Sequence, residues 1–454
     1  TGSKLKTIDQ YAFSQASALE SIIIPASVTT INNNAFSKAT ALSSITFGSN
    51  GFNSQLTSIE YETFSYLPNL KSITIPPLVE SIDETAFWYL GALTEARVNI
   101  DSLGKHGFPS KTGPKGVLGN YPAVINITGY KILSGTGELT SKIVSANLNG
   151  ANEVIIEGYI SIGSNAFNGA TTVTSIVIPS TVTSIGYQAF FSAKNLTDVN
   201  IPSSVTSIGV RAFYNTALTS ITIPEGVTSI ESATFQQMYS LTSISIPASV
   251  TSIGLGVFNW STSLANITVS SSNTHYKTID GVLFDSSGAT LIQYNSGNVR
   301  SLYAVPTSVT TIVNPAFMGA SHLNSITIPA SVKAIGGYAF YSTTYLKEII
   351  FEPGSQITSI EQYVFYESGL SSITIPASVT SIGTNAFFQT GSLTSIYIPA
   401  DVDSIGTDAF QNSVLAEATI NVDMLGKTGF PTSLGSGQTI GGKSGVNISG
   451  YKIF

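Results

Sequence analysis

The sequence contains no cysteine and carries few charges. Only 10% of its 454 residues are charged, and 19 Lys and Arg stand against 26 Asp and Glu. The absence of Cys excludes disulfides, thiolate metal sites and a cysteine nucleophile. The net charge of −7 and the lack of clustered Lys and Arg argue against nucleic acid as a partner, because phosphate binding needs grouped cations.

Long hydrophobic runs are also missing. Hydrophobic residues make up 42% of the chain, but Ser, Thr and Asn interrupt them throughout. No apolar run approaches the ~20 residues of a membrane helix, which predicts that this chain does not span a membrane.

Residues for catalysis or metal binding do not form a recognisable set. The three histidines are far apart in sequence: His106, His275 and His322. The carboxylates closest to a calcium or acid–base arrangement are Asp280 and a group formed by Asp401, Asp403 and Asp408. Ser and Thr abound without a neighbouring base, and neither a GxSxG elbow nor a phosphate loop is present. We therefore predict no catalytic residue, no metal site and no cofactor.

What the chain does contain is one phrase in many copies, typified by residues 241–258, LTSISIPASVTSIGLGVF. Ile244 and Ile246 are two apart and share one face of a predicted strand. Pro247 has no N–H and ends that strand, and Gly254 permits a tight or left-handed turn before the final Phe. One such unit exposes its apolar side chains, whereas a stack of them buries these side chains, as in a solenoid.

Fourteen phenylalanines close copies of this phrase, mostly 22 or 23 residues apart: Phe13, Phe36, Phe64, Phe87, Phe167, Phe190, Phe213, Phe235, Phe258, Phe317, Phe340, Phe365, Phe387 and Phe410. This period lies within the ~20–29 residues of leucine-rich repeats. We expect a mainly β solenoid of parallel stacked strands with short helical or 3-10 turns.

A Gly- and Pro-rich motif occurs twice and divides the chain. Leu103 corresponds to Leu425 and Tyr130 to Tyr451, 322 and 321 residues apart. We predict four parts: a partial repeat array at 1–100, a terminal motif at 101–133, a second array at 134–424 with a β-hairpin insertion at 275–305, and the second motif at 425–454.

The repeated phrase resembles the BspA-like, or Treponema-type, leucine-rich repeat over residues 5–100 and 154–420. The resemblance rests on the ordered combination of Leu, Ile, Ile-Pro, Val, Ile-Gly and Ala-Phe. The resemblance implies a leucine-rich-repeat solenoid in a secreted or surface-displayed protein that adheres to host matrix proteins, other cells or biofilm. Many relatives carry Cys shortly after the Phe, where this chain has Ala170, Ala320 and Ser342.

Aromatic residues recur near the closing Phe, and a solenoid would stack them along one edge. They either cover the core by local packing or form a binding strip. The second alternative is open because Tyr is frequent at protein interfaces and can stack on sugars. The candidate strip comprises Tyr187, Tyr214, Tyr239, Tyr338, Tyr341, Tyr345, Tyr363 and Tyr366.

Two functions stay open, and neither is enzymatic. The first is adhesion or protein–protein interaction at the cell surface or outside the cell, with an extracellular protein or glycan as partner. The second is a structural subunit of an extracellular filament or layer, a homo-polymer built head to tail. In that case a neighbouring chain would cover the first repeat, residues 5–13, which lacks its strand half.

Overall fold

The computed structural model describes residues 3–48, 51–121 and 125–452, which contacts group into two compact units. The first unit holds residues up to 135 together with 142–158 and 172–177. The second holds 136–141, 159–171 and the chain from 178 onward. The four-part division drawn from the sequence stays a prediction.

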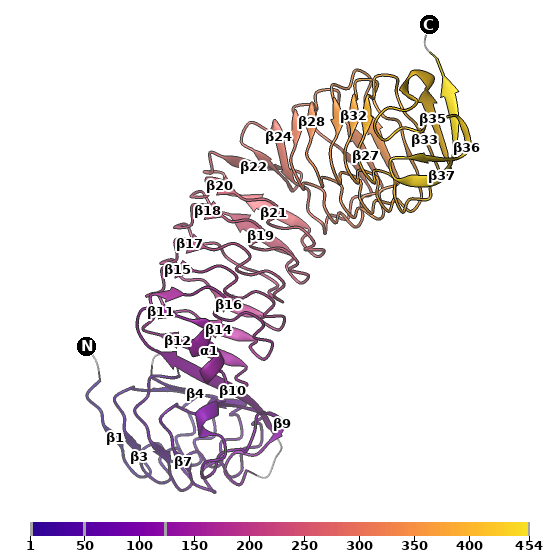
Figure 1. Cartoon of the computed structure of the whole chain (residues 1–454). Helices are drawn as coiled ribbons and strands as arrows, with labels where there is room; N and C mark the ends of the chain where they lie inside the picture. Colours follow the sequence, from indigo (N-terminus) through magenta and orange to yellow (C-terminus); the bar gives the residue numbers. More distant parts are fainter. Residues whose placement is uncertain (1–2, 49–50, 122–124, 453–454) are drawn as a thin grey trace. The chain divides into compact units, whose positions relative to one another are not determined.

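In the first unit, the repeats contribute longer strands and very short strands (Figure 1). The longer strands are β2 (Ser21–Ile24), β4 (Ser44–Phe47), β6 (Ser72–Thr74), β8 (Glu95–Asn99), β10 (Ile125–Ser134), β12 (Glu153–Glu157) and β14 (Ser175–Val177). The short ones are β1 (Thr7–Ile8), β3 (Thr30–Ile31), β5 (Ser58–Ile59) and β7 (Ser81–Ile82), and an extra strand is β9 (Gly113–Gly116). The helices are η1 (Ile100–Ser102) and α1 (Ser141–Asn147), whose first residue belongs to the second unit.

The second unit repeats this arrangement. Its longer strands are β16 (Asp198–Asn200), β19 (Ser243–Ile246), β21 (Asn266–Val269), β25 (Leu302–Ala304), β27 (Ser325–Ile328), β29 (Glu348–Phe351), β31 (Ser372–Ile373), β33 (Ser395–Tyr397), β35 (Glu417–Asn421) and β37 (Lys443–Tyr451). Its short strands are β11 (Glu138–Leu139), β13 (Ser161–Ile162), β15 (Ser184–Ile185), β17 (Ser207–Ile208), β18 (Ser229–Ile230), β20 (Ser252–Ile253), β26 (Thr311–Ile312), β28 (Ala334–Ile335), β30 (Ser359–Ile360), β32 (Ser381–Ile382) and β34 (Ser404–Ile405). The remaining elements are β22 (Tyr276–Ile279), β23 (Val282–Asp285), β24 (Thr290–Gln293), η2 (Val422–Met424) and β36 (Gly435–Ile440).

Equivalent strands of successive turns pair in parallel with a shift of one repeat. Ser243 pairs with Asn266 and Ile244 with Ile267, and β19 alternates exposed and buried side chains as predicted. Hydroxyls reinforce the pairing, because Ser204 Oγ donates to the carbonyl of Val182 in the preceding turn at 2.7 Å. The predicted parallel solenoid with a period of about 23 residues is confirmed.

The closing phenylalanines form the centre of the core. Phe213 is fully buried, and its ring lies 5.0 Å from that of Phe190 and 5.9 Å from that of Phe235, both stacked. Its backbone N–H donates to the carbonyl of Thr234 in the next turn at 3.0 Å. The Phe213 ring is therefore held by a backbone ladder as well as by its neighbours.

The turn around each Phe contains left-handed residues that the sequence reasoning did not place. Around Phe36, φ is 58° at Asn34 and 62° at Lys38, and around Phe387 it is 54° at both Asn385 and Gln389. These positions lie two before and two after the ring. The frequent Asn there follows from its tolerance of this conformation.

Gly254, in contrast, does not have a positive φ, so the left-handed alternative for it is wrong. A Cβ on Gly254 would lie 2.5 Å from the backbone N of Ser232, and one on Gly406 would lie 2.4 Å from that of Thr384. At these two glycines the close approach of the preceding turn leaves no room for a Cβ, whereas other repeats carry Asn32, Glu60 or Glu231 after the short strand.

The two copies of the terminal motif have the same structure. Asn99 and Asn421 each accept a bond from the second residue of η1 and η2 at 3.0 Å. The hydroxyls of Tyr130 and Tyr451 donate to carbonyls more than two repeats earlier, at 2.6 and 2.9 Å. β10 pairs in parallel with both β8 and β12, so the ladder of the first unit runs through its motif.

The insertion in the second unit is an antiparallel meander of β22, β23 and β24. β24 then pairs in parallel with β26 and rejoins the repeat. Tyr294, which follows β24, is fully buried, stacks on Phe317 at 5.1 Å and donates its N–H to Ala316. It is therefore a closing aromatic that the count of phenylalanines missed.

We predict that Phe213→Ala lowers the unfolding free energy by roughly 3–5 kcal/mol, because it leaves a cavity between two stacked rings. Urea unfolding followed by circular dichroism measures this. Tyr345→Ala is the control, since Tyr345 is 61% exposed. A loss below about 1 kcal/mol for Phe213→Ala would mean that the ring ladder is not core.

A second prediction concerns backbone approach. Gly406→Ala should cost about 1–3 kcal/mol, the range for overpacking, because its Cβ would overlap the backbone of Thr384. Gly391→Ala is the matched control, since nothing lies within 4 Å of a Cβ there and its φ is not positive. Equal melting temperatures for the two variants would contradict the prediction.

Candidate functional site

Four of the eight predicted tyrosines come together in the second unit. Tyr338 stacks on Tyr363 with ring centroids 4.6 Å apart, and Tyr341 stacks on Tyr366 at 4.9 Å. Phe388 extends the second column, 4.9 Å from Tyr366. We call these five residues the tyrosine lattice.

The repeat geometry causes this arrangement. Tyr338 and Tyr363 lie two residues before the closing Phe, whereas Tyr341, Tyr366 and Phe388 lie directly after it. Because the turns pair in register, side chains at the same repeat position stack. The two columns also touch, since Tyr338 and Tyr341 are 5.9 Å apart and tilted by 37°.

All five lattice side chains are half-buried. Burial raises the pKa of Tyr338, Tyr341 and Tyr366, and the neighbouring carboxylate of Glu367 adds to this at Tyr341 and Tyr366. The hydroxyls therefore remain protonated and neutral over the physiological range, and each can donate a hydrogen bond.

The other four predicted tyrosines lie outside the lattice. Tyr214 stacks on Phe191 at 4.6 Å, and burial followed by the nearby Tyr239 raises its pKa. Tyr187, Tyr239 and Tyr345 are 45%, 49% and 61% exposed, and none has a stacked ring within the described part of the chain. The predicted strip is therefore one lattice and several separate rings.

The first unit contains an aromatic pair that the candidate strip omitted. Tyr66 stacks on Tyr89 at 4.4 Å, Trp88 meets Tyr89 edge-on, and the Nζ of Lys38 lies 5.4 Å from the centre of the Tyr66 ring. Tyr66 and Tyr89 are 23 residues apart. Their spacing of one repeat is the signal that could have identified them.

Two of the acidic candidates, Asp280 and Asp403, lie in a turn and in an ion pair. Asp280, with φ 52°, and Gly281, with φ 77°, form the two-residue turn between β22 and β23. Asp403 pairs with Lys427 at 3.2 Å. Over residues 3–48, 51–121 and 125–452, no three His, Asp or Glu side chains converge as metal ligands would.

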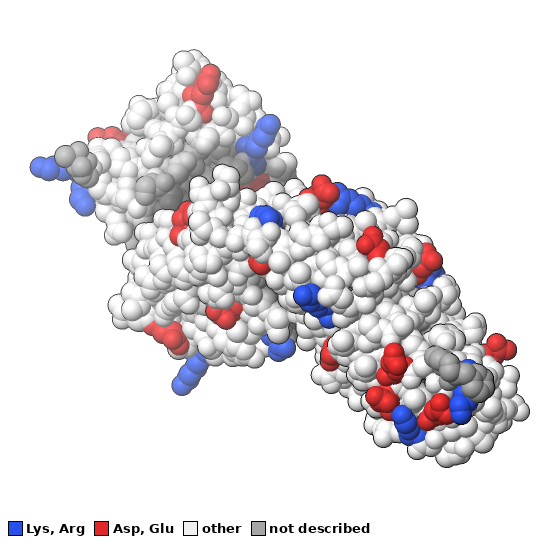
Figure 2. Space-filling view, turned by 90° about the horizontal axis from the view of Figure 1, so that it is seen from above, with Lys and Arg blue, Asp and Glu red and all other residues white. Residues whose placement is uncertain are grey.

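On the face seen in Figure 2, charged side chains of both signs are few and are distributed over a mostly uncharged surface. Among the residues that the structure describes, no helix has the length and apolarity to cross a membrane.

The sequence profile described as "BspA type Leucine rich repeat region (6 copies)" matches residues 2–113, 160–288 and 293–421, most of the chain. The chain belongs to this family. The predicted family membership is therefore confirmed.

Solved structures of bacterial leucine-rich repeat proteins are similar to this BspA-type chain. A leucine rich cell surface protein from Faecalibacterium prausnitzii is 30% identical with a TM-score of 0.54, covering 66% of this chain and 84% of that one. A leucine-rich repeat protein from Eubacterium ventriosum is 26% identical with a TM-score of 0.49, covering 63% and 91%. No curated protein matches the sequence.

Proposed function

We propose that this BspA-type repeat protein is a non-enzymatic binding protein of the cell surface or the extracellular space, and that the tyrosine lattice holds its partner. The observation that carries the proposal is the gathering of five half-buried aromatic side chains in two touching columns. Family membership and the described cell-surface relative support the location.

The geometry favours a protein over a glycan as the partner. Within each column the ring faces cover one another, at 4.6 Å for Tyr338 and Tyr363 and 4.9 Å for Tyr341 and Tyr366. Sugars bind aromatic faces, and stacking covers both faces of Tyr366 and one face of each other lattice ring, which favours contacts through ring edges and hydroxyls. Edges and neutral hydroxyl donors suit the carbonyl groups and apolar side chains of a protein surface.

The lattice is also rigid, which favours binding. Each ring is fixed by its stacked neighbour and by the backbone ladder beneath it, for example the bond from Ser342 N to the carbonyl of Tyr366 at 2.8 Å. Little side-chain entropy is lost when such rings are immobilised by a partner. Tyr at well-packed positions is a common source of interface binding energy.

The test is a comparison of two triple variants. Tyr338, Tyr341 and Tyr366 are changed to Ala in one, and the separate, exposed Tyr187, Tyr239 and Tyr345 in the other. Binding to a panel of immobilised extracellular matrix proteins and glycans is measured by surface plasmon resonance. We expect the lattice variant to lose at least about tenfold in affinity for a protein, as interface hot spots do, and the control to bind normally.

Circular dichroism would confirm that both triple variants keep the fold. Equal protein binding by the wild type and the folded lattice variant would remove the lattice from the binding surface. Binding to glycans alone would replace the protein partner by a carbohydrate.

A further inference from the structure

The repeat ladder of the second unit is interrupted between the turn of Phe258 and the turn of Tyr294. The sheet of β18 and β20 ends at β20, and a new sheet begins with β22, β23 and β24. The Phe258 ring stacks on Phe235 at 6.0 Å, whereas Tyr294 stacks on Phe317. The continuous core that follows begins at Val282 and excludes Phe258.

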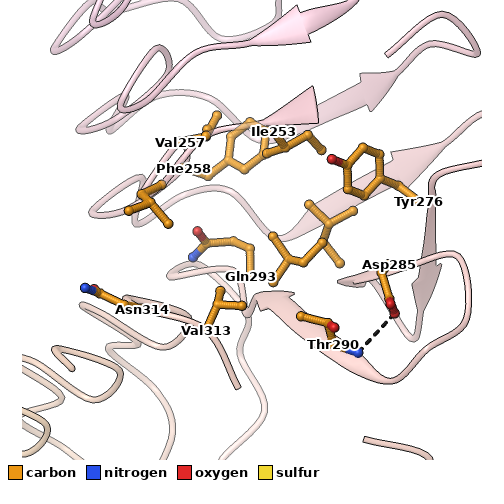
Figure 3. A pocket seen from close by; sticks show the side chains of 14 residues that line it. Ile253, Val257, Phe258, Tyr276, Asp285, Thr290, Gln293, Val313 and Asn314 are labelled. Atoms are coloured by element: carbon orange, nitrogen blue, oxygen red, sulfur yellow. Dashed lines mark hydrogen bonds between the residues drawn. The ribbon is translucent and has the colours of Figure 1, made fainter. Parts of the chain in front are cut away.

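A cavity of about 310 Å³ fills this interruption (Figure 3). One wall is the segment 253–258, and the opposite wall comes from β23, β24 and the turn at Val313 and Asn314. Ile253 is only partly buried, whereas its counterparts Ile208 and Ile230 are 3% and 2% exposed. The missing neighbour thus leaves apolar surface facing the cavity.

The first wall presents backbone donors. In the preceding turn, the N–H groups of Ala233, Phe235 and Gln237 donate to the carbonyls of residues 255, 257 and 259 at 3.1, 3.1 and 2.9 Å. The equivalent donors one repeat later are those of Gly256, Phe258 and Trp260. None of these three has an acceptor among the described residues, and Phe258 is fully buried. Buried N–H groups without a partner are rare in proteins.

The opposite wall needs no such partner. The free edge of β24 is taken by β23, with Leu283 paired to Gln293. The carboxylate of Asp285 accepts bonds from the N–H of Gly288 and Thr290 at 2.8 and 3.0 Å and from the hydroxyl of Ser287. These bonds hold the pKa of Asp285 below its usual value although burial opposes them, so this charge is already satisfied within its own turn.

We propose that this cavity binds an extended peptide segment of a partner protein. A carbonyl group of this segment accepts from the N–H of Gly256, which is only half-buried, in place of the missing repeat turn. The segment's aliphatic side chain packs among Val257, Leu283, Ile292 and Val313. Addition of an extended segment to a free row of backbone donors is a common mode of peptide recognition, and the volume suits about two residues.

No residue that lines this cavity belongs to the tyrosine lattice, so the proposal does not rest on the lattice. Tyr276 closes one side of the cavity, since its hydroxyl lies 3.4 Å from the carbonyl of Thr251, and burial raises its pKa, so it stays protonated. Trp260 continues the row of donors, and its ring contacts Tyr341 edge-on at 6.4 Å. Trp88→Phe leaves Trp260 as the single tryptophan of the chain, a reporter beside the cavity.

In the experiment, the full chain carrying Trp88→Phe is titrated with N-acetyl-leucine methylamide, which has one leucine side chain between two peptide groups. Calorimetry and the emission of Trp260 follow the binding. We expect saturation with a Kd of about 1 mM, the order for a ligand of this size. Isoamyl alcohol, which is soluble in water and has the side chain without the carbonyls, should bind about tenfold more weakly. Equal binding of both probes, or no heat and no change in emission up to about 10 mM, would overturn the proposal.

A filling variant locates the site. Val313→Phe occupies the cavity and should weaken binding of the probe at least about tenfold, whereas Val299→Phe should not, because Val299 is 76% exposed. Ile292→Phe fills the cavity from β24 and replaces Val313→Phe if that variant fails to fold. Unchanged affinity in a folded filling variant would overturn the proposal. The triple lattice variant should bind the probe normally. The failure of the cavity proposal can then be distinguished from the failure of the proposed function.

Discussion

The hydrogen-bonded match between successive turns is the constraint on which the rest of the structure depends. The N–H of most closing phenylalanines donates to the next turn, as Phe190 does to Ala212 at 2.8 Å and Phe213 to Thr234 at 3.0 Å. The ladder holds only if every turn has the same path. The left-handed residues around the closing phenylalanines are what that path requires of the sequence, and glycines such as Gly254 and Gly406 stand where two turns approach most closely.

The same match explains why the chain has so few charges. Side chains at one repeat position stack about 5 Å apart, as Tyr341 and Tyr366 do at 4.9 Å. Two like charges at that distance repel by about 1 kcal/mol even in a water-like dielectric, and the penalty recurs at every turn. Hydroxyls can instead bond from turn to turn, as Ser249 Oγ does to the carbonyl of Val227 at 2.7 Å. A polar but weakly charged composition follows.

Periodicity made the regular part of the fold predictable. The alternation at Ile244 and Ile246, the stop at Pro247 and the spacing of the phenylalanines identify strands, turns and core without any structure. Periodicity does not reveal backbone angles, so the left-handed positions were missed. For the same reason the left-handed turn at Gly254, one of the two predicted alternatives, was wrong. Tyr294 was missed because the search followed one residue type, and 36 residues separate it from Phe258. The lattice was partly predictable, because side chains at the same repeat position stack when the turns pair in register. The exposure of each tyrosine and the position of Tyr345 outside the lattice do not follow from the register.

An interruption of the ladder has different consequences for its two sides. β24 can leave the preceding turn because β23 folds back onto its edge, so the inserted hairpin supplies the lost partner. The turn of Phe258 gains no such substitute, and the N–H groups of Gly256, Phe258 and Trp260 have no acceptor among the described residues. An unpaired buried donor costs about 1–3 kcal/mol, which any acceptor that enters the cavity recovers. Inserting a hairpin into a repeat protein therefore creates a one-sided row of donors, and a repeat that builds length elsewhere becomes a place where another chain can bind.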